Sequence, residues 1–174
     1  MVTTGTTGFL SNLKNSEVID LLDSKTVCQD LSDYTYEVNW ATGGLLNNIN
    51  PLICGGRNSF NIDILECNII GTNQKLELMH PRTFSASIVI GDKLWVTGGE
   101  ISPNTSEIIL LNKKVSMAGP DLPMDFNSHC MTWANDTHVI LTGGKNTDVK
   151  TFVVDIHNNF SMVPGPLMNT PRQS

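Results

Sequence analysis

The chain has 174 residues, of which 40% are hydrophobic, so it can bury a core and is not disordered as a whole. Only 16% are charged, the formal net charge is −6 and the pI is about 5.0, which argues against nucleic acids and anionic membranes as partners. No apolar run approaches the ~18 residues of a membrane span, and no basic start precedes an apolar stretch. We therefore expect a cytoplasmic location, with secretion as the alternative.

In chain order, the clearest elements are three short apolar strands that each end at two glycines. They cover residues 51–56, 94–99 and 139–144, and the second glycines lie 43 and 45 residues apart. A residue without Cβ can adopt a positive φ and lets another backbone approach closely, so these glycines are expected to be structural. The three pairs are Gly55 and Gly56, Gly98 and Gly99, and Gly143 and Gly144.

The same kinds of segment follow each glycine pair. A β-branched strand is expected at 62–67, 106–111 and 151–156, with an earlier copy at 16–21. A short third strand follows near 76–78, 115–117 and 160–163, and a closing strand at 84–90 or 128–134 leads into the next glycine-terminated strand. Four short strands in about 45 residues is the pattern of a β-propeller blade. The expected repeats cover approximately 1–33, which is incomplete, 34–80, 81–124 and 125–170.

This pattern resembles the kelch repeat family. The residues that carry the resemblance are Pro81-Arg82 and Pro171-Arg172, the segment 91–99, the strands with Glu107 and Asp155, and His129 in a first strand. Three features depart from the family: the last strand lacks its usual Trp, the first copy has lost one glycine, and the 39–50 stretch matches only loosely. The resemblance implies an all-β, kelch-type β-propeller that is partial, with about three to four blades of four antiparallel strands.

Both chain ends cut through a repeat. We therefore expect the chain to be a fragment of a longer protein. An alternative is an open arc that associates with a second copy, because the end faces of an incomplete propeller would be apolar and exposed.

Nothing in the sequence indicates catalysis, and we expect no enzyme activity, no cofactor and no metal site. The histidines His80, His129, His138 and His157 lack ligand spacing, and no nucleophile motif occurs. Copper radical oxidases similar to galactose oxidase need Tyr and His ligands, whereas only Tyr34 and Tyr36 are present here. The four cysteines are expected to be mainly free thiols, although Cys54 and Cys67 fall on adjacent expected strands and a disulfide between them stays open.

The resemblance places a binding rim in the loops that follow the glycine pairs and in those that lead into each first strand. An Arg after a glycine pair, such as Arg57, can bind a peptide carboxylate with its forked guanidinium. The alternative is that these are solvated turn residues. The candidate rim residues are Arg57, Asn58, Ser59, Arg82, Phe84, Glu100, Asn104, Lys145, Asn146 and Asp148.

The expected function is recognition of another protein, as a substrate receptor or a scaffold. The resemblance implies that relatives carry an N-terminal adaptor domain linking them to a ubiquitin ligase or to actin. Two alternatives remain: the remnant of a secreted or enzymatic propeller, or a truncated product without function.

Overall fold

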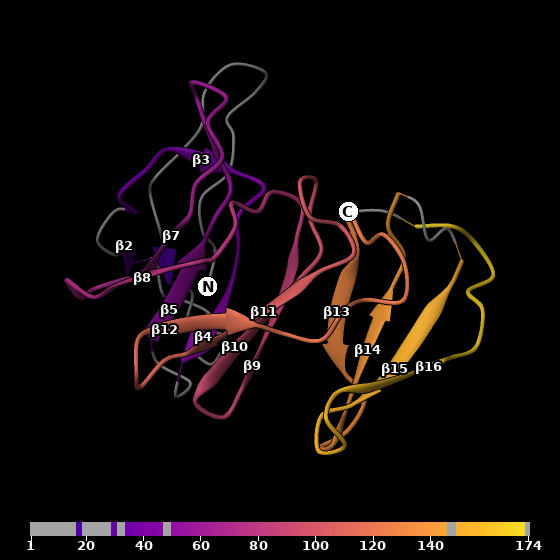
Figure 1. Cartoon of the computed structure of the whole chain (residues 1–174). Coiled ribbons are helices and arrows are strands. Elements are labelled where there is room, and N and C mark those ends of the chain that lie inside the picture. The colour runs from indigo at the N-terminus through magenta and orange to yellow at the C-terminus, as the bar shows by residue number, and fades with distance from the viewer. Residues whose placement is uncertain (1–16, 19–28, 31–33, 47–49, 146–148, 173–174) are drawn as a thin grey trace.

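The computed structural model describes residues 17–18, 29–30, 34–46, 50–145 and 149–172, and every regular element in them is a β-strand. Three four-stranded antiparallel sheets follow one another along the chain (Figure 1). The all-β class expected from the sequence is confirmed. None of the described residues forms a helix long and apolar enough to cross a membrane.

Within each sheet the strands lie in chain order, so that each sheet is a simple meander. The first sheet contains β4 (Thr42–Leu46), β5 (Asn50–Cys54), β7 (Glu66–Ile69) and β8 (Lys75–Glu77). The second contains β9 (Ala86–Ile90), β10 (Lys93–Thr97), β11 (Ser106–Leu110) and β12 (Val115–Ala118). The third contains β13 (Cys130–Trp133), β14 (His138–Thr142), β15 (Thr151–Asp155) and β16 (Ser161–Pro164).

Two short ladders accompany the first sheet. The strands β3 (Val38–Asn39) and β6 (Arg57–Asn58) pair, as do β1 (Glu17–Val18) and β2 (Gln29–Asp30). The rest of the expected repeat 1–33 lies outside the described residues. The strand expected at 62–67 lies later, in β7, because the residues after Gly56 pair with β3 and turn back in a bridge between Arg57 and Asp63.

The core lies between the sheets, which pack face to face. Leu52 and Ile69 of the first sheet lie against Leu94 and Ile109 of the second. On the opposite face of the second sheet, Trp95 packs against the third sheet. Since the second sheet is covered on both faces, four of the five β11 residues, Ser106–Ile109, are buried, as in other doubly covered strands.

The first strands of the three sheets lie beside one another, since β9 contacts both β4 and β13. Two glycines in β4 permit close packing, Gly43 against β5 within the sheet and Gly44 against β9 of the next sheet. A Cβ on Gly43 would collide with the backbone carbonyl of Leu52, and one on Gly44 would lie 2.5 Å from a methyl group of Val89. The sheets therefore converge at their first strands, as the side-by-side arrangement in Figure 1 illustrates.

Cys54 and Cys67 face each other across β5 and β7 and form a disulfide within the core of the first sheet. Both side chains are fully buried. The two strands are adjacent, as expected, but the expectation of free thiols is wrong for these two residues, because the structure joins their sulfur atoms. Cys130 is a free, exposed thiol.

The outer face of the third sheet is only partly covered. Val139 and Leu141 point toward the second sheet, so the alternation along β14 turns Ile140 to the opposite side. Ile140 pairs with Val153, and Val153 pairs with Val163, which is exposed. This row of apolar side chains corresponds to the row in the second sheet that contains the buried Trp95.

Candidate binding rim

The segment that leads into each of the three sheets passes through a left-handed residue. Trp40, Phe84 and Ser128 stand two residues before a first strand and have φ values of 57°, 56° and 55°. This conformation is uncommon for residues other than glycine. The amide of Phe84 donates to the carbonyl of Trp40 at 3.3 Å, and the amide of Ser128 donates to that of Phe84 at 2.9 Å. The three connections are therefore linked at one end of the sheets.

The glycine pairs hold these connections in place. The amides of Gly56, Gly99 and Gly144 donate to the carbonyls of Arg82, Phe126 and Arg172 at 2.9, 2.9 and 2.8 Å. All six paired glycines have positive φ values. A Cβ on Gly55 would lie 2.5 Å from the carbonyl oxygen of Arg82, and Gly98 and Gly143 face equivalent carbonyls. Their role is structural, because any larger residue would push the following connection away.

Arg57 links the first two sheets at this rim. Its Nε and Nη2 donate to the carboxylate of Asp63 at 2.6 and 3.2 Å, and Nη2 also donates to Glu100 at 2.6 Å. The hydrogen bond to Asp63 raises the pKa of Arg57. Its guanidinium carbon lies 5.9 Å from the centroid of the Trp40 ring. The sequence suggested an arginine available to a peptide carboxylate, whereas the structure pairs it with two carboxylates of its own chain.

Asn58 shapes the turn that follows. Its Oδ1 accepts hydrogen bonds from the amides of Phe60 and Ile62 at 2.9 and 3.0 Å. Such side-chain bonds to nearby amides fix a tight turn. Ser59 and Phe60 are exposed at the tip of this turn.

Four large apolar side chains are exposed in the segments that hold Arg57 and its partners, and none of them is among the rim residues predicted above. Trp40, Phe60, Ile62 and Ile101 are 46%, 81%, 57% and 52% exposed. Trp40 is stacked on Phe84, with ring centroids 4.5 Å apart and an angle of 26° between the ring planes. We give the name rim patch to Arg57 together with Trp40, Phe60, Ile62 and Ile101. The sequence signal that could have identified them is the occurrence of bulky apolar residues in polar turns after a glycine pair.

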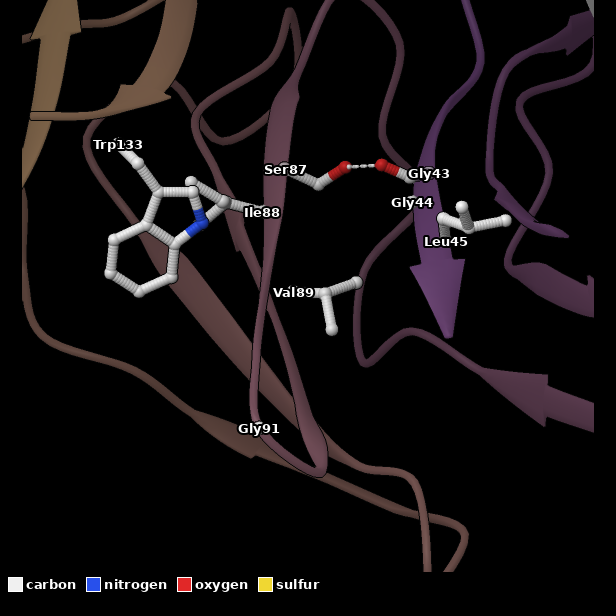
Figure 2. A pocket seen from close by; sticks show the side chains of 8 residues that line it. All are labelled: Gly43, Gly44, Leu45, Ser87, Ile88, Val89, Gly91 and Trp133. Carbon is white, nitrogen blue, oxygen red and sulfur yellow. Dashed lines mark hydrogen bonds between the residues drawn. The ribbon is translucent and has the colours of Figure 1, made fainter. Parts of the chain in front are cut away.

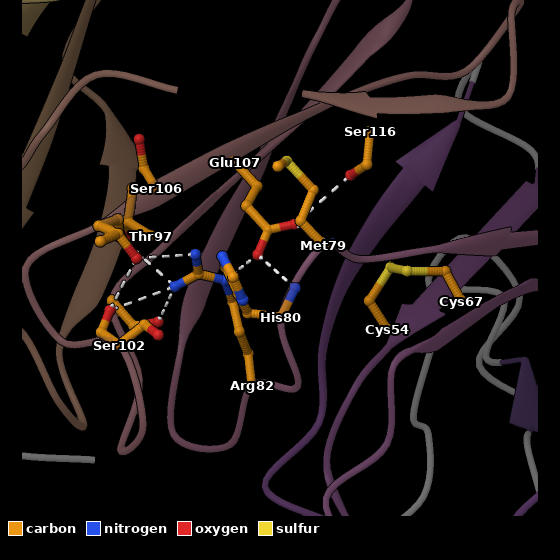
Figure 3. A network of polar contacts seen from close by, with 12 residues as sticks. Cys54, Cys67, Met79, His80, Arg82, Thr97, Ser102, Ser106, Glu107 and Ser116 are labelled. Carbon is orange, nitrogen blue, oxygen red and sulfur yellow. Dashed lines mark hydrogen bonds and ion pairs between the residues drawn. A yellow bond between two sulfur atoms is a disulfide. The ribbon is translucent and has the colours of Figure 1, made fainter. Parts of the chain in front are cut away.

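Arg82 was expected on the rim, but the structure buries it to 1% exposure together with Glu107. Its Nε donates to Glu107 at 2.7 Å, and the guanidinium also donates to the carbonyl of Gly98 and to the hydroxyl of Thr105 (Figure 3). The carboxylate of Glu107 also accepts hydrogen bonds from the backbone amides of Met79 and His80. Arg82 therefore supports the rim from beneath and cannot itself contact a partner.

The remaining candidates are spread along the rim. Glu100 and Asn104 are exposed in the loop after Gly99. Lys145 is exposed after Gly144, and its amide donates to the carbonyl of Asn127 at 2.8 Å. Asn146 and Asp148 lie outside the described residues.

A separate groove of about 480 Å³ opens between the first strands. Its walls come from β4, β9 and β13, and the hydroxyl of Ser87 donates to the carbonyl of Gly43 at 2.7 Å across it (Figure 2). Trp133 lines its far side. The groove offers backbone groups and apolar side chains and brings together no pair of titratable groups suited to acid–base chemistry.

His129 lies beneath the rim rather than on it. Its Nε2 is 2.8 Å from the hydroxyl of Thr97, and its ring lies 5.0 Å from that of Phe126. Burial lowers its pKa to about 4, so the imidazole is neutral at neutral pH. Among the described residues, no group of three or more His, Cys, Asp or Glu side chains is placed to hold a metal ion.

The two tyrosines considered for oxidase chemistry both bind Glu66. The hydroxyl of Tyr34 donates to its carbonyl at 3.1 Å, and that of Tyr36 donates to its carboxylate at 2.9 Å. Burial raises the pKa of Tyr34. Both side chains thus have structural partners in the first sheet.

No protein-family model matches the chain, and no curated protein matches it. Its function must therefore be inferred from the geometry of the described residues.

Proposed function

We propose that the chain is part of a kelch-type β-propeller and that it binds another protein through the glycine-pair rim. The observation that carries the proposal is the threefold repetition of the segment that leads into a sheet. Trp40, Phe84 and Ser128 recur every 44 residues with the same backbone conformation. Convergence of the first strands is what a radial arrangement of blades requires. An experimental structure with the sheets rotated about a common axis would support the fold, and parallel stacking without rotation would contradict it.

The rim is the better candidate for binding than the groove between the first strands. It exposes large apolar side chains beside an arginine, a composition typical of interface hot spots. Loops carried on a rigid scaffold are also where binding residues concentrate. For a propeller of this type, the kelch resemblance supports a role as substrate receptor or scaffold.

Affinity purification with three forms of the chain tests the rim. The first is the wild type, the second carries Phe60→Ser and Ile101→Ser, and the third carries Asp136→Ala in the exposed hairpin at the opposite end of the sheets. We expect partners recovered with the wild type and with Asp136→Ala to be lost with the rim variant. Recovery of a ligase component or of actin would support the scaffold role. Partners that survive the rim changes but need Asp136 would contradict the proposal.

We also propose self-association through the outer face of the third sheet. The apolar row formed by Ile140, Val153 and Val163 supports this, since contiguous exposed apolar surface marks contact sites. Light scattering should give a molar mass above the 19.0 kDa of one chain. The mass should fall to that of a monomer for Val163→Asp, and a wild-type monomer would contradict this second proposal.

A further inference from the structure

The rim patch carries charge of a definite sign. Around Arg57 the network holds one guanidinium and two carboxylates, those of Asp63 and Glu100. Glu100 is 47% exposed, whereas Asp63 is mostly covered. The charged group most accessible to a partner at this site is therefore a carboxylate.

Arg57 is poorly suited to capture an acidic partner. Its guanidinium already donates three hydrogen bonds to carboxylates and stands near the Trp40 ring. An incoming carboxylate would have to displace Glu100 or lie beside it, and like charges in contact are unfavourable. The net charge of −6 for the whole chain acts in the same direction, because it repels acidic partners and attracts basic ones.

The apolar part of the patch is held in place before binding. Trp40 is stacked on Phe84, and both residues are fixed in the left-handed conformation by the linked connections. The Asn58 side chain fixes the turn that presents Phe60 and Ile62. Binding to such a surface orders few additional groups, so little affinity is lost to conformational entropy.

We propose that the rim patch binds a protein segment in which a bulky apolar side chain stands next to Lys or Arg. The apolar side chain packs between Phe60, Ile62 and Ile101. The cation lies against Glu100, the more exposed of the two carboxylates, where it forms a charge-assisted hydrogen bond. This inference rests on the proposed function of the rim and adds the chemistry of the partner.

A random peptide library displayed on phage tests the proposal on the intact chain. Peptides are selected on the wild type after removal of those that bind the Phe60→Ser, Ile101→Ser variant. We expect the enriched sequences to combine Trp, Phe or Leu with a neighbouring Lys or Arg. A synthetic enriched peptide should bind the wild type and lose about tenfold or more in affinity to Phe60→Ser, as is typical for a central contact.

Charge is tested in two ways on the same peptide. Exchange of its Lys or Arg for Glu should weaken binding about tenfold, and Glu100→Gln should remove most of this discrimination. Leu167→Ala, which changes an exposed apolar residue beyond the third sheet, is the matched control and should leave affinity unchanged. Thermal unfolding of each variant confirms that it is folded.

The outcomes separate the two proposals. Enriched peptides that are acidic and still depend on Phe60 would overturn the basic partner class while leaving the binding rim in place. A selection that yields no binder after peptides that also bind the variant have been removed would overturn both.

Discussion

The second and third sheets carry chemically different side chains at one equivalent position, just before the first strand. Arg82 and Phe126 both stand two residues before a left-handed residue, and each gives its carbonyl to a glycine of the preceding sheet. In the second sheet the Arg82 side chain meets Glu107 in a buried ion pair. In the third sheet Phe126 meets Phe152, with ring centroids 5.7 Å apart and an angle of 74° between the planes.

The difference shows that the repeated backbone fixes where a side chain goes but not its chemistry. An aromatic pair needs only close packing. A buried ion pair must recover the cost of leaving water, and it does so only when its remaining donors and acceptors are bonded as well. Arg82 and Glu107 meet this condition through Gly98, Thr105 and two backbone amides.

The largest expected effect comes from breaking the ion pair on one side. Glu107→Ala leaves the Arg82 guanidinium buried without a countercharge, and removal of one partner of such a pair costs about 3–5 kcal/mol. Urea unfolding should show this loss in the free energy of unfolding. Glu77→Ala, at an exposed site in β8, is the control and should change it by less than about 0.5 kcal/mol. Equal midpoints for the two variants would show that the pair does not hold the connection.

The disulfide distinguishes the first sheet from the other two. The positions of Cys54 and Cys67 correspond to Thr97 and Ser106 in the second sheet, which are paired in the same register. Replacement of the cysteines by Thr and Ser should cost about 3 kcal/mol, because the closed loop of the unfolded chain is released. Urea unfolding without reductant measures the loss.

Thiol labelling gives an independent check of the disulfide. Under denaturing, non-reducing conditions, a maleimide should leave Cys54 and Cys67 unlabelled and should label both after reduction. Labelling of either residue before reduction would contradict the bond.

The entry to the third sheet, unlike that to the second, contains a buried histidine, His129, and the free energy of unfolding should therefore fall in acid. The folded-state pKa of His129, about 4, lies below the ordinary value of 6.5, so between these pH values the unfolded chain binds the proton more readily. Stability is therefore full above pH 6.5 and falls as the pH drops toward 4. At pH 5 the loss should be about 2 kcal/mol relative to pH 7.5.

Substitution isolates the contribution of His129. The difference in unfolding free energy between pH 7.5 and pH 5 should shrink by about 2 kcal/mol in His129→Gln. An unchanged pH dependence in His129→Gln would contradict the assignment.

The smallest effect is expected when the ion pair of the second sheet is replaced by two apolar side chains, as the third sheet has at the equivalent positions. Arg82→Met with Glu107→Leu removes both charges together, and such replacements of buried pairs are commonly neutral or stabilising. The double variant should lie within about 1 kcal/mol of the wild type, or above it. If the double variant lost as much unfolding free energy as Glu107→Ala alone, the ion pair would stabilise the fold beyond the neutralisation of each charge by the other.

Sequence patterns anticipated the strands better than the rim. Apolar runs ending at glycine pairs gave β5, β10 and β14, and β-branched runs gave β11 and β15, because strand burial leaves a local signature. The 39–50 stretch matched the repeat only loosely, yet β4 forms there through Gly43 and Gly44. Those glycines admit neighbouring strands, a reason that is visible only when Leu52 and Val89 are in place.

The rim residues show where local reasoning stops. Arg57 is bound to Glu100, 43 residues away, and Arg82 is buried against Glu107. Nothing near either arginine in the chain distinguishes a free guanidinium from a paired one. The local sequence does not show that Trp40 and Phe60 are exposed, because apolar residues occur both in cores and on surfaces.

The sequence by itself determined the all-β class, the positions of most strands and the places where glycine is required, since these depend on side-chain periodicity and on local backbone freedom. The tertiary structure decided which carboxylates pair with Arg57 and Arg82, which cysteines are joined and which apolar side chains face solvent. These properties depend on pairs of groups brought together from distant parts of the chain, and their energies arise only when the sheets pack and exclude water.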